Sequence, residues 1–251
     1  MQNRQFRAVL LYSTDMTEYH NDLFGLAIRD YLAGRPHDLI SWTSVSPPEI
    51  FRTAYLFRSF ENMPVHERVA LLMSEGKILD VGAGAGSHVL ALQEAGSRVT
   101  ALERSALAVK AMKKRGVNNI LHTDFFEMPE HEKFDTLLFL MNGAGMVESL
   151  QRMPAFFKKI RSVLNKEGKA LIHFSPVDYI YEMFGLTFPQ ERYYGEVMFY
   201  LKYKHLCQRP FPWIYFDRET FYRWAVEAGF HFEIVIEEEA TGDYLAEMRP
   251  G

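Results

Sequence analysis

Three acidic residues end or follow successive strand-like segments of the chain, and their positions suit a binding site for a nucleotide-like ligand. Asp80 lies in the glycine-rich run ILDVGAGAG, Glu103 ends RVTALE, and Asp124 follows ILHT. Glu103 lies 21 residues beyond Gly82 (103 − 82), which is the spacing of a carboxylate that accepts hydrogen bonds from ribose hydroxyls. Because parallel strands present their carboxyl ends at one edge of a sheet, we expect the three acids to line one site.

The glycines of segment 78–86 predict that the ligand lies against the main chain. Gly82 and Gly84 allow a sharp turn and leave room where a Cβ would clash. Nicotinamide and flavin enzymes place G-x-G-x-x-G at the same point, although the third position here is Ser87. Asp80 favours another ligand, because a carboxylate repels a pyrophosphate and attracts the ammonium and sulfonium groups of a methionine-derived cofactor. The alternative is a helix–sheet turn flanked by surface acids.

Two further positions have a functional and a structural interpretation. Asp124 and Phe125 suit an adenine ring, with the acid accepting from the amino group and apolar surface packing on the ring. The alternative for Asp124 is a helix-capping role. Asn142 follows the apolar run 134–141 and suits either the reacting end of a cofactor site or a tight turn with Gly143.

The sequence assigns no catalytic residue. Asp178, Tyr179 and His173 are candidates for a general base, which is needed only if the acceptor enters protonated. His173 also lies in a strand pattern and suits a packed core residue. The nine histidines show no metal-ligand spacing such as H-E-x-x-H, so we expect no metal site. Cys207 has no recognisable nucleophile context and is expected to be inert.

Strand and helix patterns alternate through the middle of the chain, which predicts a parallel sheet with right-handed crossovers. Helices are indicated by apolar residues at helical spacing and by closing glycines such as Gly96 and Gly116. The expected strands are 77–81, 98–102, 119–122, 134–141 and 169–174, with two more near 232–237 and 244–248.

Two regions depart from this alternation. Residues 1–75 have a mostly helical pattern interrupted by prolines, and we interpret them as a helical N-terminal extension, in which segment 55–58 suits either a lid over the cofactor or a packing helix. Residues 176–212 are rich in aromatic side chains, which suit the wall of an acceptor pocket as well as ordinary core packing. The expected organisation is therefore the extension 1–75 and a core 76–251, with 176–212 as a substrate-side insertion after the fifth strand.

The runs ILDVGAGAGSHVLALQEAGSRVTALERS, HTDFF, FDTLLFLMN and LNKEGKALIHF resemble the core of class I S-adenosylmethionine-dependent methyltransferases, over about residues 76–175. The tail AVEAGFHFEIVIEE resembles the last helix and strands of that fold. The resemblance implies an α/β fold with a Rossmann-like, seven-stranded, mostly parallel sheet, helices on both faces and an antiparallel last strand.

The same resemblance implies S-adenosyl-L-methionine as the cofactor and gives roles to the residues of the site. The methionine part would lie at the glycine turn, the ribose at Glu103, the adenine at Asp124 and Phe125, and the reacting end near Met141 and Asn142. The complete expected cofactor-binding set is Asp80, Gly82, Ala83, Gly84, Glu103, Arg104, Asp124, Phe125, Met141 and Asn142.

Composition and charge narrow the class of partner. A net charge of −4 and a pI near 6.2 give no basic surface for a nucleic acid. The segment Asn142-Gly-Ala-Gly145 lacks the Asn-Pro-Pro-aromatic sequence of enzymes that methylate amino groups of nucleic acids. One cysteine fits a reducing compartment, and the chain shows no signal peptide and no apolar run long enough to span a membrane. We expect a cytoplasmic protein that uses neither nucleic acid nor membrane.

The sequence thus predicts a methyltransferase that acts on a small molecule through an oxygen, nitrogen or carbon nucleophile. The acceptor, the methylated atom and the oligomeric state are not predicted. Three alternatives stay open: a protein methyltransferase of the same fold, a nicotinamide-dependent oxidoreductase, and a non-catalytic protein that senses the cofactor.

Overall fold

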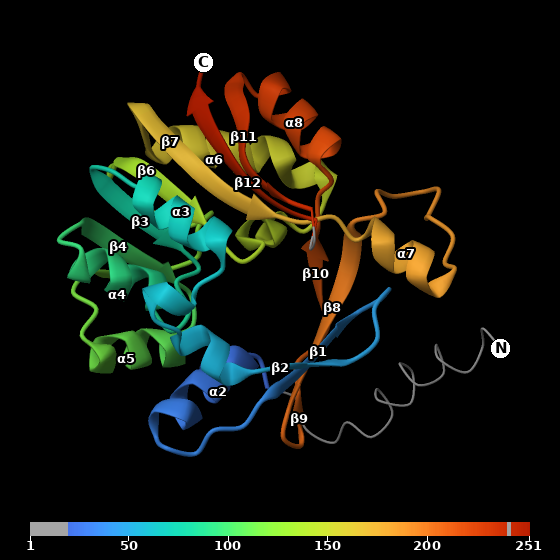
Figure 1. Ribbon diagram of the computed structural model, residues 1–251, viewed down its shortest axis with the longest axis horizontal. Helices are drawn as coiled ribbons and strands as arrows, with labels where there is room; N and C mark the ends of the chain where they lie inside the picture. The colour runs from blue at the N-terminus through green and yellow to red at the C-terminus, as the bar shows by residue number, and fades with distance from the viewer. Residues whose placement is uncertain (1–19, 240–241) are drawn as a thin grey trace.

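A computed structural model describes residues 20–239 and 242–251 as two sheets with helices around the larger one (Figure 1). The larger sheet has seven strands in the order β11-β12-β7-β6-β3-β4-β5, and the smaller has five, in the order β10-β8-β1-β2 with β9 paired to β8. The larger sheet consists of β3 (Lys77–Val81), β4 (Arg98–Glu103), β5 (Ile120–His122), β6 (Phe134–Phe139), β7 (Leu164–Phe174), β11 (Phe230–Glu238) and β12 (Asp243–Pro250).

The strand directions confirm the expected sheet. β3 is parallel to β4 and β6, β5 is parallel to β4, and β7 is parallel to β6. β12 is antiparallel to both β7 and β11, so the last strand runs against the sheet as predicted. β7 begins earlier than the sequence pattern indicates, because Leu164 already pairs with Phe134 before a register shift leads to the pair Thr136 and Lys169.

Helices cover both faces of the larger sheet, and alternation along the strands sorts side chains between them. α6 (Met153–Val163) and α8 (Arg218–Glu227) pack on the face that includes Leu79. α3 (Val65–Met73), α4 (Ser87–Glu94) and α5 (Ala106–Arg115) pack on the face that includes Ile78. Side chains two residues apart in a strand share a face. Asp80 therefore lies on the same face as Ile78, toward α3 and α4.

The smaller sheet corrects the prediction that residues 1–75 are mostly helical. α2 (Leu23–Leu32), the 3-10 helices η1 (Thr53–Phe57) and η2 (Phe60–Asn62), and α3 are helical, but β1 (Leu39–Thr43) and β2 (Glu49–Phe51) are strands. β1 pairs along its length with β8 (Glu196–Tyr203), from Leu39 with Tyr203 to Thr43 with Phe199. β1 has five residues, and its strand conformation depends on pairing with β8 more than on local propensity. Residues 1–19 of this region lie outside the described residues.

The segment after β7 contributes the rest of the smaller sheet. It contains α7 (Asp178–Phe184), β8, β9 (Leu206–Cys207) and β10 (Phe211–Ile214). Figure 1 shows β10 beside the end of β7, below the larger sheet. Trp213 of β10 packs so closely on the loop after β6 that a Cβ on Gly145 would lie 2.0 Å from its Nε1. The two sheets therefore meet at the loop that contains Asn142. Within 20–239 and 242–251, no helix is both long and apolar enough to cross a bilayer.

Candidate active site

The glycine turn between β3 and α4 presents bare backbone to open space. Gly82 and Gly84 have φ of +76° and +56°, in the left-handed region that favours glycine. A Cβ on Gly82 would meet no described atom within 4 Å, and one on Gly84 would meet only the Gly82 carbonyl oxygen at 3.9 Å. Gly86 differs, because its Cβ would press on Met112 and Val117 at 3.0 Å. Gly82 and Gly84 therefore leave room for a ligand, whereas Gly86 serves the packing of α4 on α5.

Asp80 is a buried carboxylate beside this turn. It is 2% exposed, and its Oδ2 has no hydrogen-bond partner among the described residues. His88 Nδ1 lies 3.9 Å from Oδ2, beyond hydrogen-bonding distance. Burial raises the pKa of Asp80 to about 6, with Glu103 and Glu67 adding to the rise and His88 opposing it. A cationic group at the turn would supply the missing partner.

A buried chain of charged residues lies behind Asp80, and sequence reasoning missed it. Glu67 of α3 accepts from Arg58 and lies 2.9 Å, through Oε2, from His88 Nε2. Burial alone would raise the pKa of Glu67, but the hydrogen bonds from His88 and Arg58 lower it to about 2. Ser87 Oγ donates to the Leu56 carbonyl at 2.7 Å, which ties η1 to the start of α4. The N-terminal segment thus holds His88 in place against Asp80.

Glu103 closes the other side of the turn. Its Oε2 accepts from the Gly84 amide and its Oε1 from the Ser105 amide, both at 2.8 Å. Burial raises the pKa of Glu103, and these backbone hydrogen bonds oppose the rise. Each carboxylate oxygen has a second lone pair, so both can still accept from hydroxyl groups. Ser105 also caps α5 and donates to Asp22 Oδ2 at 2.6 Å, which joins α2 to this corner.

Asp124 and Phe125, the residues predicted to contact adenine, lie in different surroundings. Asp124 Oδ1 accepts from the Phe126 amide at 2.9 Å, and its Oδ2 lies 4.0 Å from Arg104 Nη1. The side chain of Phe125 is 2% exposed and packs edge-on against Phe139 in the core. The Phe125 side chain therefore packs in the core, and the contact of this residue with adenine stays a prediction.

Ala83 also points away from the turn. Its side chain lies in the core on the face of α3 and α4, and its amide donates to the Leu102 carbonyl at 3.1 Å. At the turn itself, Asp80 has an oxygen without a partner among the described residues. Gly82 and Gly84 offer open space rather than free amides, because their amides donate to the Leu102 carbonyl and to Glu103 Oε2.

Met141 and Asn142 form a strained turn after β6. Both have left-handed backbones, with φ of +55° and +57°, a conformation that costs roughly 1–2 kcal/mol for a residue other than glycine. The Asn142 side chain exchanges hydrogen bonds with Ser175, donating to its Oγ at 3.0 Å and accepting from its amide at 2.8 Å. The Asn142 amide donates to His173 Nδ1 at 2.9 Å. Asn142 therefore holds a tight turn, as its structural interpretation predicts.

The three candidates for a general base differ in their contacts and exposure. His173 uses its Nδ1 lone pair on the Asn142 amide, so that nitrogen cannot take a proton from an acceptor. Tyr179 is half exposed, and Asp178 Oδ1 accepts from its amide at 2.9 Å at the start of α7. Neither is brought to the glycine turn by a contact within the described residues. Cys207 is buried, and burial raises the pKa of its thiol, as expected of an inert cysteine.

Part of the aromatic segment serves packing. The hydroxyls of Tyr193 and Tyr194 donate to Asp217 Oδ2 at 2.6 and 3.1 Å, the two rings contact each other, and the Tyr194 ring also contacts Phe188. Asp217 in turn caps α8 through the Thr220 amide. These tyrosines fasten the segment to the larger sheet.

Comparison with known proteins gives relatives over nearly the whole chain. A family model described as a methyltransferase domain matches residues 79–172. A solved structure of an S-adenosylmethionine-dependent methyltransferase from Bacteroides fragilis, in complex with S-adenosyl-L-homocysteine, is 36% identical, with a TM-score of 0.83; the match covers 92% of this chain and 95% of that one. No curated protein matches.

More distant structures share the fold. The CcbJ methyltransferase from Streptomyces caelestis is 11% identical with a TM-score of 0.58, over 76% of this chain and 94% of that one. The PH0226 protein from Pyrococcus horikoshii OT3 is 18% identical with a TM-score of 0.58, over 79% of this chain and 98% of that one.

Proposed function

Because the chain belongs to the class I S-adenosylmethionine-dependent methyltransferases, we propose that it transfers the methyl group of S-adenosylmethionine to a small molecule. The relative from Bacteroides fragilis is in complex with S-adenosyl-L-homocysteine, the product that remains after methyl transfer. The observation in this chain that carries the proposal is the unpartnered Oδ2 of buried Asp80 beside the open backbone of Gly82 and Gly84.

The residues around the turn fit this cofactor by charge and by shape. Asp80 would hold the ammonium of the methionine part, because an ionised carboxylate in a buried place gains most from a cationic partner. Glu103 is fixed by two backbone amides and would accept from the ribose hydroxyls with little further ordering. Asp124 and the Phe125 backbone would lie nearest the adenine. A pyrophosphate would instead meet the two carboxylates of Asp80 and Glu103, which disfavours a nicotinamide cofactor.

Bound there, S-adenosylmethionine supplies an activated methyl group, so the chain's main tasks are to align the acceptor and to exclude water. Met141 and Asn142 would set the floor of the reacting end, held by Ser175 and His173. The link from Ser87 to Leu56 supports a covering role for the N-terminal segment over the cofactor turn.

A small acceptor is favoured over a protein by the position of the smaller sheet. β10 packs Trp213 onto Gly145 in the loop after β6, which narrows the approach to Asn142 from that side. An extended polypeptide needs an open groove, whereas a small molecule needs only a pocket walled by nearby side chains. The proposed acceptor is therefore a metabolite-sized molecule.

The acceptor is tested with S-adenosylmethionine carrying an isotopically labelled methyl group. The purified protein is incubated with a pool of small metabolites and, separately, with the protein fraction of the same extract. Label in a small molecule, absent with Asp80→Ala, is the expected result. Label in the protein fraction alone would replace the proposed acceptor class, and no label in either would favour a non-catalytic cofactor sensor.

A further inference from the structure

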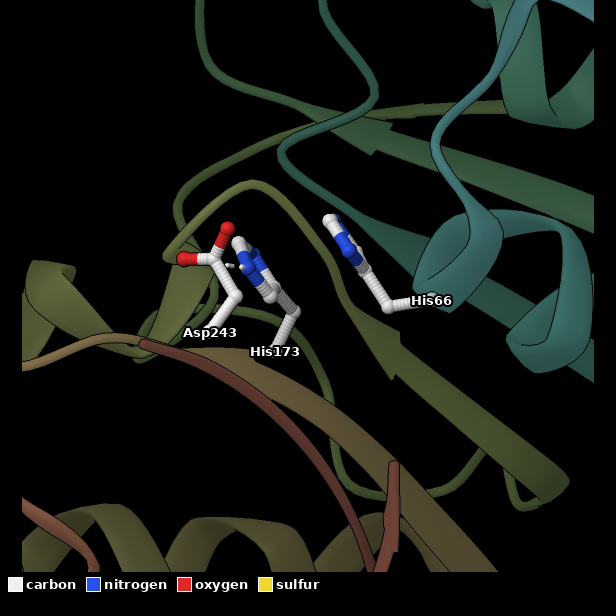
Figure 2. A group of neighbouring side chains, drawn as sticks. All are labelled: His66, His173 and Asp243. Carbon is white, nitrogen blue, oxygen red and sulfur yellow. Dashed lines mark ion pairs between the residues drawn. The ribbon is translucent and has the colours of Figure 1, made fainter. Parts of the chain in front are cut away.

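Two histidines and an aspartate meet on the sheet face that carries Asp80, outside the glycine turn (Figure 2). His173 lies near the end of β7, His66 on α3, and Asp243 at the start of β12. The two imidazoles are 5% and 4% exposed and stack with centroids 4.1 Å apart and planes inclined by 7°. His173 Nε2 lies 3.4 Å from Asp243 Oδ1. The contacts of His173 with His66 and Asp243 have no role in the proposed cofactor site.

The hydrogen bond from the Asn142 amide fixes the protonation of His173. A backbone N–H can only donate, so His173 Nδ1 at 2.9 Å must accept and must carry a lone pair. The ring is then neutral with its proton on Nε2, the nitrogen that faces Asp243. A carboxylate opposite Nε2 favours this tautomer over the one with the proton on Nδ1.

The group that His173 holds is the strained turn after β6. Met141 and Asn142 adopt left-handed backbones that persist only where surrounding contacts impose them. Ser175 fixes the side chain of Asn142, and His173 fixes its amide. Both anchors lie at the end of β7, so β7 determines the shape of the neighbouring loop.

We propose that His173 is a positioning residue, whose unprotonated Nδ1 holds the Met141–Asn142 turn at the reacting end of the site while Asp243 fixes its tautomer. The role of this turn in methyl transfer rests on the proposed function. The anchor itself is a property of the fold. Protonation of His173 would set an N–H against the Asn142 N–H, donor against donor, and release the turn.

Some groups around His66 and His173 favour a protonated ring, and others oppose it. Asp243 of β12 faces His173, and Glu238 of β11 lies 3.6 Å from His66 Nδ1, so both carboxylates favour a protonated ring. Burial, and then His173, lower the pKa of His66, while Glu67, Asp243 and Glu238 oppose the shift. Tyr55 and Tyr179 also face Asp243, and both are neutral at physiological pH because burial raises each pKa. Two stacked imidazoles resist being charged together, and the hydrogen bond from the Asn142 amide identifies His173 as a neutral ring.

The same three side chains are a possible donor set for a metal, since one ligand atom of each lies within 4.8 Å of the others. A metal-bound histidine normally donates its second N–H to a neighbour. Here that second nitrogen, His173 Nδ1, accepts instead. The parallel rings also direct their lone pairs into separate planes rather than toward one point. The geometry therefore favours the anchor over a metal site.

The first test uses the wild-type protein, so that no variant has to fold. Nitrogen-15 chemical shifts of the His173 ring are measured by NMR between pH 5 and 8. The expected result is a neutral ring with a protonated Nε2 at pH 8, together with an Asn142 amide shifted by its hydrogen bond. A proton on Nδ1 at pH 8 would overturn the proposal.

The second test compares variants by hydrogen exchange over residues 141–147 and by calorimetry with S-adenosylhomocysteine. His173→Phe keeps a ring but removes the acceptor, and should speed exchange of the Asn142 amide about tenfold or more. His173→Gln offers a side-chain oxygen and should restore part of the protection. His66→Phe keeps the stack and should leave the exchange of Asn142 unchanged. Equal exchange in all three variants would refute the anchor.

Two controls distinguish the positioning role of His173 from the proposed function and from a metal site. Failure of the wild type to bind S-adenosylhomocysteine would refute the proposed function, while the tautomer and the exchange of Asn142 would still test the anchor. Titration with Zn²⁺ tests the metal: no binding is expected. Tight binding of one ion that is lost in both His66→Ala and His173→Ala would overturn the positioning role.

Discussion

Replacement of Asp80 by asparagine removes a buried charge and should change stability and cofactor binding in opposite directions. In the ligand-free protein, the pKa of Asp80 rises from 3.8 to about 6 because the side chain is buried. A rise of about 2 units corresponds to roughly 3 kcal/mol of folding free energy. Asp80→Asn avoids the ionised state, so we expect the variant to be more stable than wild type at pH 8 by up to about 3 kcal/mol.

The pH range of this effect follows from the direction of the shift. A group whose pKa is raised on folding contributes its stability fully below its unfolded pKa, and the contribution is lost as pH rises through its folded pKa. For Asp80 the loss runs from about pH 4 to just above pH 6. Urea denaturation should therefore show little difference between variant and wild type near pH 4, an advantage of the variant that grows until just above pH 6, and a constant advantage from there to pH 8.

Cofactor binding should fall in the same variant. A hydrogen bond to a charged group contributes roughly 1.5–3 kcal/mol, so the dissociation constant of S-adenosylhomocysteine should rise about 10- to 100-fold at pH 8. Asp135→Asn is the matched control, because the Asp135 carboxylate accepts from the Lys77 amide and from Asn165 outside the site. These hydrogen bonds lower the pKa of Asp135. The control should lose stability at pH 8 and bind S-adenosylhomocysteine normally. An Asp80→Asn protein that is less stable at pH 8 and binds as tightly as wild type would refute the reasoning.

Four other variants test the site by separate routes. Gly82→Ala points its Cβ into open space and should weaken binding of S-adenosylhomocysteine in calorimetry, while its left-handed φ costs roughly 1–2 kcal/mol of stability. Gly86→Ala has the same backbone cost and also presses its Cβ on Met112 and Val117, so it should lower the melting temperature further. Equal effects of the two on stability and on binding would contradict their assigned roles. Glu103→Gln should weaken binding about tenfold, since one carboxylate acceptor is replaced by an amide donor; unchanged calorimetry would exclude contact with the ribose. Glu67→Gln leaves Arg58 buried with a neutral partner and should lower the free energy of unfolding by about 3 kcal/mol in urea; a neutral result would show that the pair adds nothing to the fold.

The larger sheet could be predicted because each of its elements has a local pattern. Apolar runs ending in glycines indicate strands such as β3, and helical spacing of apolar residues indicates α6. The acids that follow these strands meet at one sheet edge for topological reasons alone. Asp80 and Glu103 were therefore predictable as neighbours, although their burial and their partners were not.

The smaller sheet and the buried charge chain could not be predicted from local patterns. β1 and β2 are short, and β1 gains its stability by pairing with β8 far along the chain. Arg58 follows η1, Glu67 lies on α3 and His88 on α4, so the three have no shared spacing. Of the three, only His88 could have been singled out from the sequence, because it is a polar residue on the first helical turn after the glycines. His173 was correctly predicted as a packed residue, but its partners His66 and Asp243 lie on other elements.

Calorimetry of S-adenosylhomocysteine with the wild-type protein at pH 8 tests the central claim most directly. We expect one ligand to bind per chain, with competition by S-adenosylmethionine and no competition by NADH. Absence of binding, together with protection against thermal unfolding by NADH, would contradict the assignment of the turn at Asp80 to a methyl donor.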